Sequence, residues 1–145
     1  MEEIVAYGPS RYDIVAVYEA TAIEHVENAV ARYGSGYGSL QVYYPPATSL
    51  SDHPFCVLKA DWVAPEEAEA AEMFLNFLTS PEMQELALRH GFRPVDDSIS
   101  LEKAGSPFPR YAGNGVRLDL VSEVEVPPGN VLNTMLELWA RTVQP

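Results

Sequence analysis

Histidines, the side chains that most often carry catalysis or bind metals, are few in this sequence and are not grouped. His25, His53 and His90 lie far apart, and no pair has the short spacing of metal ligands. The chain has no G-x-S-x-G nucleophile elbow, no phosphate-binding P-loop and no dinucleotide-binding fingerprint. We therefore expect no catalytic residue, no cofactor and no metal site.

Three other features could be read as chemistry, and each has a simpler interpretation. The stretch YGSGYGSL resembles a phosphate-cradling loop, but it leads into a predicted strand, which favours a flexible connector at residues 34–39. This connector is either a natural loop or an artificial join. The acidic clusters at residues 66–69 and 96–97 are typical of solvated surfaces. The single cysteine, Cys56, lies in an apolar run and is predicted to be a small core residue.

Composition limits the partners that this chain can have. Its 145 residues fit one domain, and 47% hydrophobic with 21% charged residues are values typical of globular proteins. A net charge of −12 with only nine scattered Lys and Arg residues argues against nucleic acid and anionic membranes. No apolar run is long enough to span a bilayer, and the acidic start of the chain is not a secretory signal.

The elements that must hold any site follow an α/β pattern. Ile14–Tyr18 is a continuous, β-branched apolar run, typical of a strand that is covered on both faces. Leu40–Tyr44 and Phe55–Lys59 also have strand-like sequences, and we expect all three segments to share one mixed or parallel sheet. Residues 92–126 are rich in Pro and Gly and are expected to be irregular.

Helices are predicted to begin at about Glu19, Pro65, Ser80 and Val131. Pro65 suits a first helical position, and Ser80 before Pro81 is a good N-cap sequence. The Pro65 helix has one apolar stripe, which we expect to lie on the sheet. The core predicted from this packing contains Cys56, Trp62, Phe74, Phe77 and Leu78.

Several of these segments, in this order, resemble the bacterial extracellular solute-binding proteins. They are GPSRYDIVAVYE, LQVYYPPATSLSDHPFCVLKADWV and AAEMFLNFLTSPEMQELALRHGFRP. The last is the most specific, because in that family a helix ending in F-L-x-S-P-E-x-Q opens a second helix that stops at G-F-x-P. The resemblance runs from about Tyr7 to Pro94. It suggests the C-terminal portion of a two-lobed, type II periplasmic-binding-protein-like molecule.

The resemblance implies a fold, a function and a location. It implies one partial α/β domain over residues 1–145, with 1–12 closing the second lobe and 13–145 returning into the first. It implies non-catalytic recognition of a small solute outside the cytoplasm, for uptake or surface sensing, with an ABC-type membrane transporter as a partner. The tail also resembles the subgroup that precedes a von Willebrand A domain. An alternative function is therefore an interaction scaffold beside such a domain, with ligand binding lost.

The resemblance also implies a ligand position at the end of the return strand. In relatives that bind oxyanions, the tyrosine that ends this strand lies at the cleft, and the matching residue here is Tyr18. Glu19 follows it and departs from an anion site, because a carboxylate repels anions. Ser10 is a further candidate in the preceding turn. The simpler readings are a half-buried tyrosine that ends a strand and a serine that caps a turn.

If the chain is a fragment of a longer protein, its sheet lacks neighbouring strands. An open sheet edge beside DIVAVYE would then carry unpaired backbone groups, and such an edge tends to find a partner. We therefore expect the isolated chain to form a homodimer or a larger homo-oligomer, although the charge of −12 opposes association at low salt.

Overall fold

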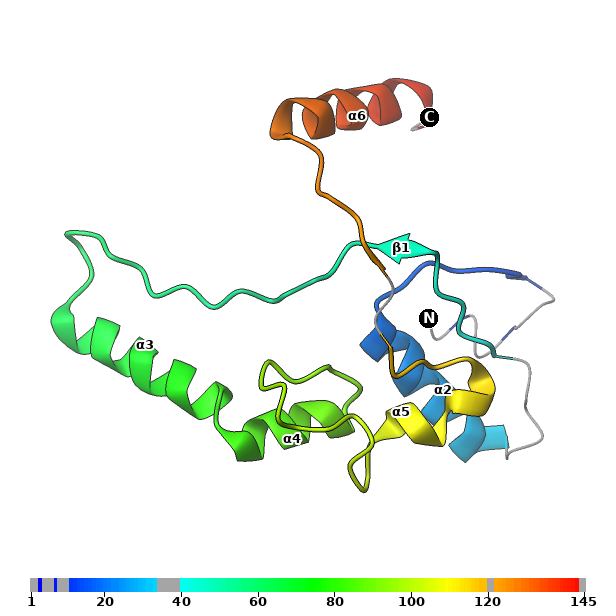
Figure 1. Cartoon of the computed structure of the whole chain (residues 1–145). Helices are drawn as coiled ribbons and strands as arrows, with labels where there is room; N and C mark the ends of the chain where they lie inside the picture. The colour runs from blue at the N-terminus through cyan, green and yellow to red at the C-terminus, as the bar shows by residue number, and fades with distance from the viewer. Residues whose placement is uncertain (1–2, 4–6, 8–10, 34–39, 120–121, 144–145) are drawn as a thin grey trace. The chain divides into compact units, whose positions relative to one another are not determined.

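The computed structural model describes residue 3, residue 7 and residues 11–33, 40–119 and 122–143. These residues fall into two units, and the first unit comprises residues 1–43 and 54–120. The second unit comprises residues 44–53 and 121–145. The helices of the first unit (Figure 1) are α2 (Glu19–Tyr33), α3 (Pro65–Leu78), α4 (Pro81–Arg89) and α5 (Pro107–Arg110), followed by the 3-10 helix η2 (Ala112–Asn114).

The second unit contains a small parallel sheet and one helix. Strands β1 (Ala47–Thr48) and β2 (Ser122–Glu123) pair in parallel, with Ala47 opposite Ser122. The backbone N–H of Val124 donates to the carbonyl of Thr48 at 2.9 Å and extends this pairing. Helix α6 (Gly129–Thr142) follows β2 and carries a wide apolar face that is exposed in this unit. The described residues therefore form a helix-rich α/β structure with a two-stranded sheet.

The predicted helix starts are confirmed, because the signals that set them are local. Helix α3 begins at Pro65, and the Glu67 side chain accepts a hydrogen bond from the Ala64 backbone N–H at 2.9 Å. Ser80 is the N-cap of α4, and the Gln84 side-chain amide donates to the Leu78 carbonyl at 2.8 Å. Helix α2 begins at Glu19, and α6 begins at Gly129, two residues before the predicted Val131.

The core of the first unit lies between α2, α4 and the segment around α5. Its buried members are Ile23 and Val26 from α2, Leu88 from α4, and Phe108, Tyr111 and Val116. Phe108 is completely buried. The expectation that residues 92–126 are irregular was therefore only partly right, because α5, η2 and β2 form inside this segment, and its residues Phe108, Tyr111 and Val116 supply half of the core. The signal for α5 was Ser106 before Pro107, the same cap sequence as at α4, and the Ser106 hydroxyl accepts from the Phe108 N–H at 3.3 Å.

Two glycines allow the backbone to approach this core closely. Gly115 has a φ of +87°, and a Cβ there would lie 2.3 Å from the carbonyl oxygen of Val42. Next to it, the Val42 N–H donates to the Asn114 carbonyl at 2.8 Å, so residues 40–42 pack along the core. Gly91 has a φ of +82° and ends α4 against Ile23.

The three-stranded sheet predicted from the sequence is wrong. Ile14–Tyr18, Leu40–Tyr44 and Phe55–Lys59 form no helix and belong to no strand of the described sheet, which contains only β1 and β2. Ile14, predicted to be buried, is 93% exposed. The physical reason is that a strand exists only when another strand satisfies its backbone groups. Strand propensity alone supplies no such partner.

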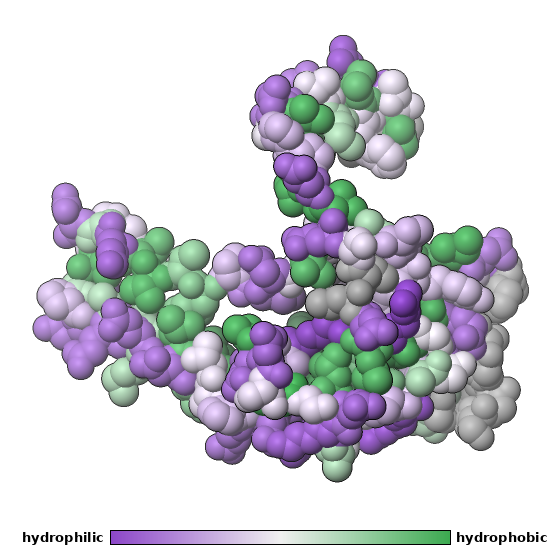
Figure 2. Space-filling model, viewed as in Figure 1, coloured by the Kyte–Doolittle hydropathy of each residue, from purple (hydrophilic) through white to green (hydrophobic). Residues whose placement is uncertain are grey.

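The predicted core around α3 is also wrong. No residue of α3 is buried, and Phe74, Phe77, Trp62 and Cys56 are all exposed. The apolar stripe exists as predicted, and Figure 2 shows hydrophobic side chains gathered on the surface of this helix. The ring of Phe74 lies 5.9 Å from Phe55 and 6.3 Å from Phe77. The stripe is exposed because the described residues of the first unit form no sheet that could cover it.

Candidate functional site

The predicted ligand position lies at the beginning of α2. Tyr18 directly precedes the helix, and its carbonyl accepts the first helical hydrogen bond from the Ala22 N–H at 2.9 Å. Its side chain is 67% exposed. The third predicted site residue, Ser10, lies outside the described residues. The structure thus places Tyr18 and Glu19 together at one helix N-terminus, where backbone N–H groups and the helix dipole favour negatively charged or polar ligands.

Glu19 is held in place by a two-pronged ion pair with Arg93. The guanidinium Nε donates to Glu19 Oε2 at 2.8 Å, and Nη2 donates to Oε1 at 2.9 Å. The two side chains are 19% and 23% exposed, so the pair is largely shielded from water. A bidentate Arg–carboxylate pair fixes both orientation and distance. The carboxylate therefore contributes little net negative charge beside Tyr18.

Arg93 also connects α2 to the end of the first unit. Its Nη1 donates to the Leu118 carbonyl at 2.7 Å, and Nη2 donates to the Arg117 carbonyl at 2.8 Å. The guanidinium carbon lies 4.9 Å from the centre of the Phe108 ring, in cation–π geometry. One side chain thus joins the first turn of α2, the buried phenylalanine of α5 and residues 117–118.

Arg93 is a residue of this site that the sequence pattern does not predict. It occupies the variable position of the G-F-x-P motif, and that motif indicates only where the helix stops. A usable signal was present, because Glu19 is an acidic residue in a first helical turn next to a buried core, where a shielded carboxylate needs a cationic partner. The identity of that partner could not be obtained from spacing, since the two residues are 74 positions apart.

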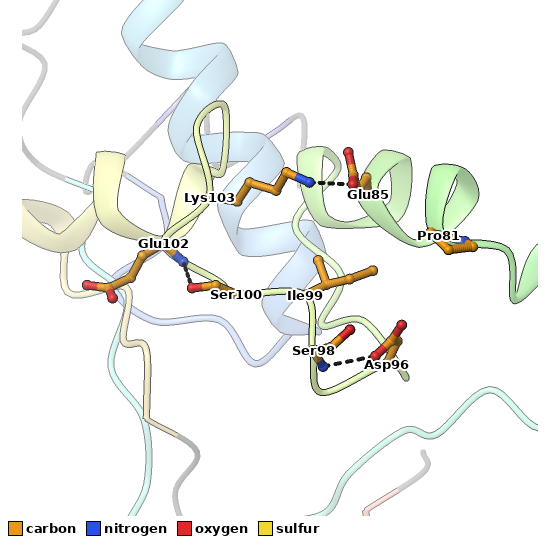
Figure 3. A pocket seen from close by; sticks show the side chains of 8 residues that line it. All are labelled: Pro81, Glu85, Asp96, Ser98, Ile99, Ser100, Glu102 and Lys103. Atoms are coloured by element: carbon orange, nitrogen blue, oxygen red, sulfur yellow. Dashed lines mark hydrogen bonds and ion pairs between the residues drawn. The ribbon is translucent and has the colours of Figure 1, made fainter.

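A second concave surface lies between the first half of α4 and residues 96–103, and it holds none of the predicted site residues. This open depression of about 460 Å³ is shown in Figure 3. Its polar groups satisfy one another. Lys103 pairs with Glu85, the Ser98 N–H donates to Asp96 at 2.9 Å, and the Glu102 N–H donates to the Ser100 hydroxyl at 3.1 Å. These contacts stabilise the surface loop itself, so we do not assign a ligand to this depression.

The hydrogen bonds from Ser98 also affect the acidity of Asp96. The Ser98 side chain and its backbone N–H both stabilise the charged carboxylate, so the pKa of Asp96 lies below its usual range. This is the behaviour of a carboxylate that caps a turn, and it is opposite to the raised pKa of a general acid.

The described residues hold no group of three or more His, Cys, Asp or Glu side chains that could bind a metal ion. Within the same residues, every helix is too short or too polar to cross a membrane.

Comparison with known protein families identifies the family of this chain. Residues 6–93 match the family model described as bacterial extracellular solute-binding protein, which is more than half of the chain. The chain belongs to this family. The match includes Tyr18, Glu19 and Arg93, whereas Phe108, Arg117 and Leu118 lie beyond it. No curated protein and no solved structure matched the chain.

Membership of the solute-binding family confirms the resemblance found in the sequence in its general form. It supports a role in solute binding outside the cytoplasm, and proteins of this family are generally not catalytic. The assignment fits the structural findings, because the candidate site offers a hydroxyl and a helix N-terminus for binding.

Proposed function

We propose that this protein recognises a small polar solute at the N-terminus of α2 and does not transform it. Tyr18 supplies a hydroxyl group, and the first turn of α2 supplies backbone N–H groups. Ser10 is proposed as a further contact. The protein would act outside the cytoplasm and deliver its solute to an ABC-type membrane transporter or to a sensing surface.

The observation that carries this proposal is the ion pair between Glu19 and Arg93. An unpaired carboxylate beside Tyr18 would repel an anionic ligand, but here Arg93 binds both carboxylate oxygens. The same pair fixes the first turn of α2, so the Tyr18 backbone is positioned before a ligand arrives. Binding to a preorganised site costs less conformational entropy than binding to a mobile one. The pair therefore makes this helix end suitable for anionic and neutral polar solutes.

A thermal-shift screen of the full chain with oxyanions, sugars and amino acids tests this function. A solute that binds only the folded protein raises the melting temperature as its concentration rises. The Tyr18→Phe variant, which lacks only the hydroxyl group, should lose most of this shift. Tyr43→Phe is the matched control, because Tyr43 is also exposed and is not part of α2 or of its first turn. Equal shifts in wild type and both variants would show non-specific stabilisation and exclude the proposed site.

The alternative function is a scaffold in which the solute-binding fold is kept and ligand binding is lost. The exposed hydrophobic faces of α3 and α6 favour it, because such surfaces are typical of protein–protein contacts. We propose a von Willebrand A domain as the neighbour in that case, by the resemblance of the tail. The scaffold function predicts that no solute in the screen raises the melting temperature.

A further inference from the structure

Two segments of the first unit are rich in apolar residues, contain no helix or strand, and make no backbone hydrogen bond to any described residue. Residues 13–17 (DIVAV) have strand-like sequence, yet Ile14–Val17 make no backbone hydrogen bond to any residue that the structure describes. Residues 55–59 (FCVLK) have the same properties. Ile14, Val15, Val17, Phe55 and Leu58 are all exposed. Each segment thus presents a row of N–H and C=O groups together with the side chains that pack best in a sheet.

We propose that these two segments pair with each other between two copies of the chain. Residues 13–17 of one copy would form an antiparallel ladder with residues 55–59 of the second copy. Asp13 then lies opposite Lys59, Val15 opposite Val57, and Ala16 opposite Cys56. A two-fold axis repeats the arrangement, so each copy gives one segment and receives the other. Both exposed segments become hydrogen-bonded in a single dimer.

Charge complementarity selects this register. Asp13 and Lys59 make no ion pair with any described residue, and they lie at the ends of the two segments that become opposite in the antiparallel ladder. Opposite charges directly across a ladder stabilise it. A ladder between two copies of residues 13–19 would instead place Asp13 opposite Glu19, and a parallel ladder would place Lys59 opposite Val17. Neither arrangement gives the lysine a partner.

The side chains along this register also fit in size. Ile14 meets Leu58 and Val17 meets Phe55, which places large apolar side chains opposite one another. Ala16 meets Cys56, which places the two smallest side chains together. The net charge of −12 on each copy opposes the dimer, so added salt should strengthen it until the repulsion between copies is screened.

The native cysteine gives a direct test of the register. In the variant Ala16→Cys, the new thiol should lie opposite Cys56 of the second copy, within reach of a disulfide bond. Mild oxidation should give a disulfide-linked dimer on a non-reducing gel. The variant Val15→Cys points its thiol to the opposite face of the ladder, so it should cross-link at least about fivefold more slowly. Ala16 is exposed, and an unchanged circular dichroism spectrum will show that the fold is kept.

Mixing two proteins separates contact between copies from contact within one chain. One protein carries Ala16→Cys together with Cys56→Ser, and the other is the wild type, so each contains a single cysteine. A cross-linked heterodimer of the two supports the proposal. Dimers of the double variant with itself would show that residues 13–17 pair with their own copies and would overturn it. Loss of both thiols in monomeric Ala16→Cys protein would show pairing within one chain and would also overturn it.

Charge reversal tests the ladder without cysteine chemistry. Asp13→Lys and Lys59→Asp should each raise the dimer dissociation constant by about threefold to tenfold in sedimentation experiments. The chain with both changes should recover most of the wild-type value, because the pair is then reversed and intact. Glu24→Lys is the matched control for Asp13→Lys, because both change the net charge by the same amount and Glu24 is exposed on α2. A monomer at all salt and protein concentrations, or equal effects of Asp13→Lys and Glu24→Lys, would refute the proposal.

Discussion

Replacing Arg93 with alanine should destabilise the first unit more than any other change of a charged residue in the described chain. The guanidinium donates two hydrogen bonds to Glu19 and one each to the carbonyls of Arg117 and Leu118. It also stacks on Phe108 at 4.9 Å. The substitution removes all these contacts and leaves the shielded Glu19 carboxylate without its cationic partner.

The magnitude follows from burial. Breaking a fully buried ion pair costs roughly 3–5 kcal/mol, whereas an exposed pair contributes about 0–1 kcal/mol. Arg93 and Glu19 are 19% and 23% exposed, so water screens part of the interaction and the expected loss is about 2–3 kcal/mol. Arg93→Lys keeps the charge but cannot bind both carboxylate oxygens and two carbonyls together. We expect it to cost about half as much.

Urea unfolding, followed by circular dichroism at the helical minimum, measures this loss as a lower midpoint with an unchanged slope. Arg110 supplies the matched control, because it forms an ion pair with Glu27, which lies on the same helix α2 as Glu19. Those side chains are 52% and 45% exposed, so Arg110→Ala should cost less than about 0.5 kcal/mol.

A double-mutant cycle assigns the loss to the ion pair itself. If Arg93 acts mainly through Glu19, the loss caused by Arg93→Ala should shrink by about 1–2 kcal/mol when Glu19 is already alanine. The reasoning would be refuted if Arg93→Ala cost no more than Arg110→Ala. It would also be refuted if the losses from Arg93→Ala and Glu19→Ala were simply additive.

Three further predictions follow from burial and hydrogen bonding. Phe108→Ala should cost about 3–5 kcal/mol in urea unfolding, because the ring is completely buried in the core. Phe77→Ala should cost less than about 1 kcal/mol, because this ring is 53% exposed, and a larger loss would mean that α3 is covered in solution. Asp96 has a lowered pKa, so its turn contributes stability above the ordinary value of 3.8 that is lost as the pH falls through the lowered pKa. In an NMR titration, Ser98→Ala should raise the pKa of Asp96 toward that value, and an unchanged pKa would refute the assignment.

The helices could be predicted from the sequence because their determinants are adjacent residues. Pro65 at a first helical position and Ser80 before Pro81 each fix a helix start without help from distant parts of the chain. The strands could not be predicted in the same way. The β-branched run from Ile14 gives a propensity, but whether it forms a strand depends on a partner many residues away or in another molecule.

The candidate site shows the same division between local and distant information. Tyr18 and Glu19 are neighbours, so the sequence could place them together at one helix end. Arg93 reaches Glu19 only because α2 and α4 pack on the same core through Ile23 and Leu88. The burial of Phe108 could not be predicted for a related reason. A Pro-rich sequence is typical of irregular structure, yet the four residues of α5 are enough to place this ring in the core.

Arg93 lies where the boundary of the family match differs from the boundary of the folded core. It is the last residue of the segment shared with the family, and its contacts with the Arg117 and Leu118 carbonyls and with the Phe108 ring reach beyond that segment. The segment that matches the family, residues 6–93, is therefore shorter than the segment that forms the hydrophobic core, which extends to Val116. A relative that shared only residues 6–93 would need another aromatic ring in place of Phe108. It would also need other backbone carbonyls to accept hydrogen bonds from its arginine. Gene fusions that join at the family boundary would cut through the hydrophobic core, whereas a junction after residue 118 would leave it whole.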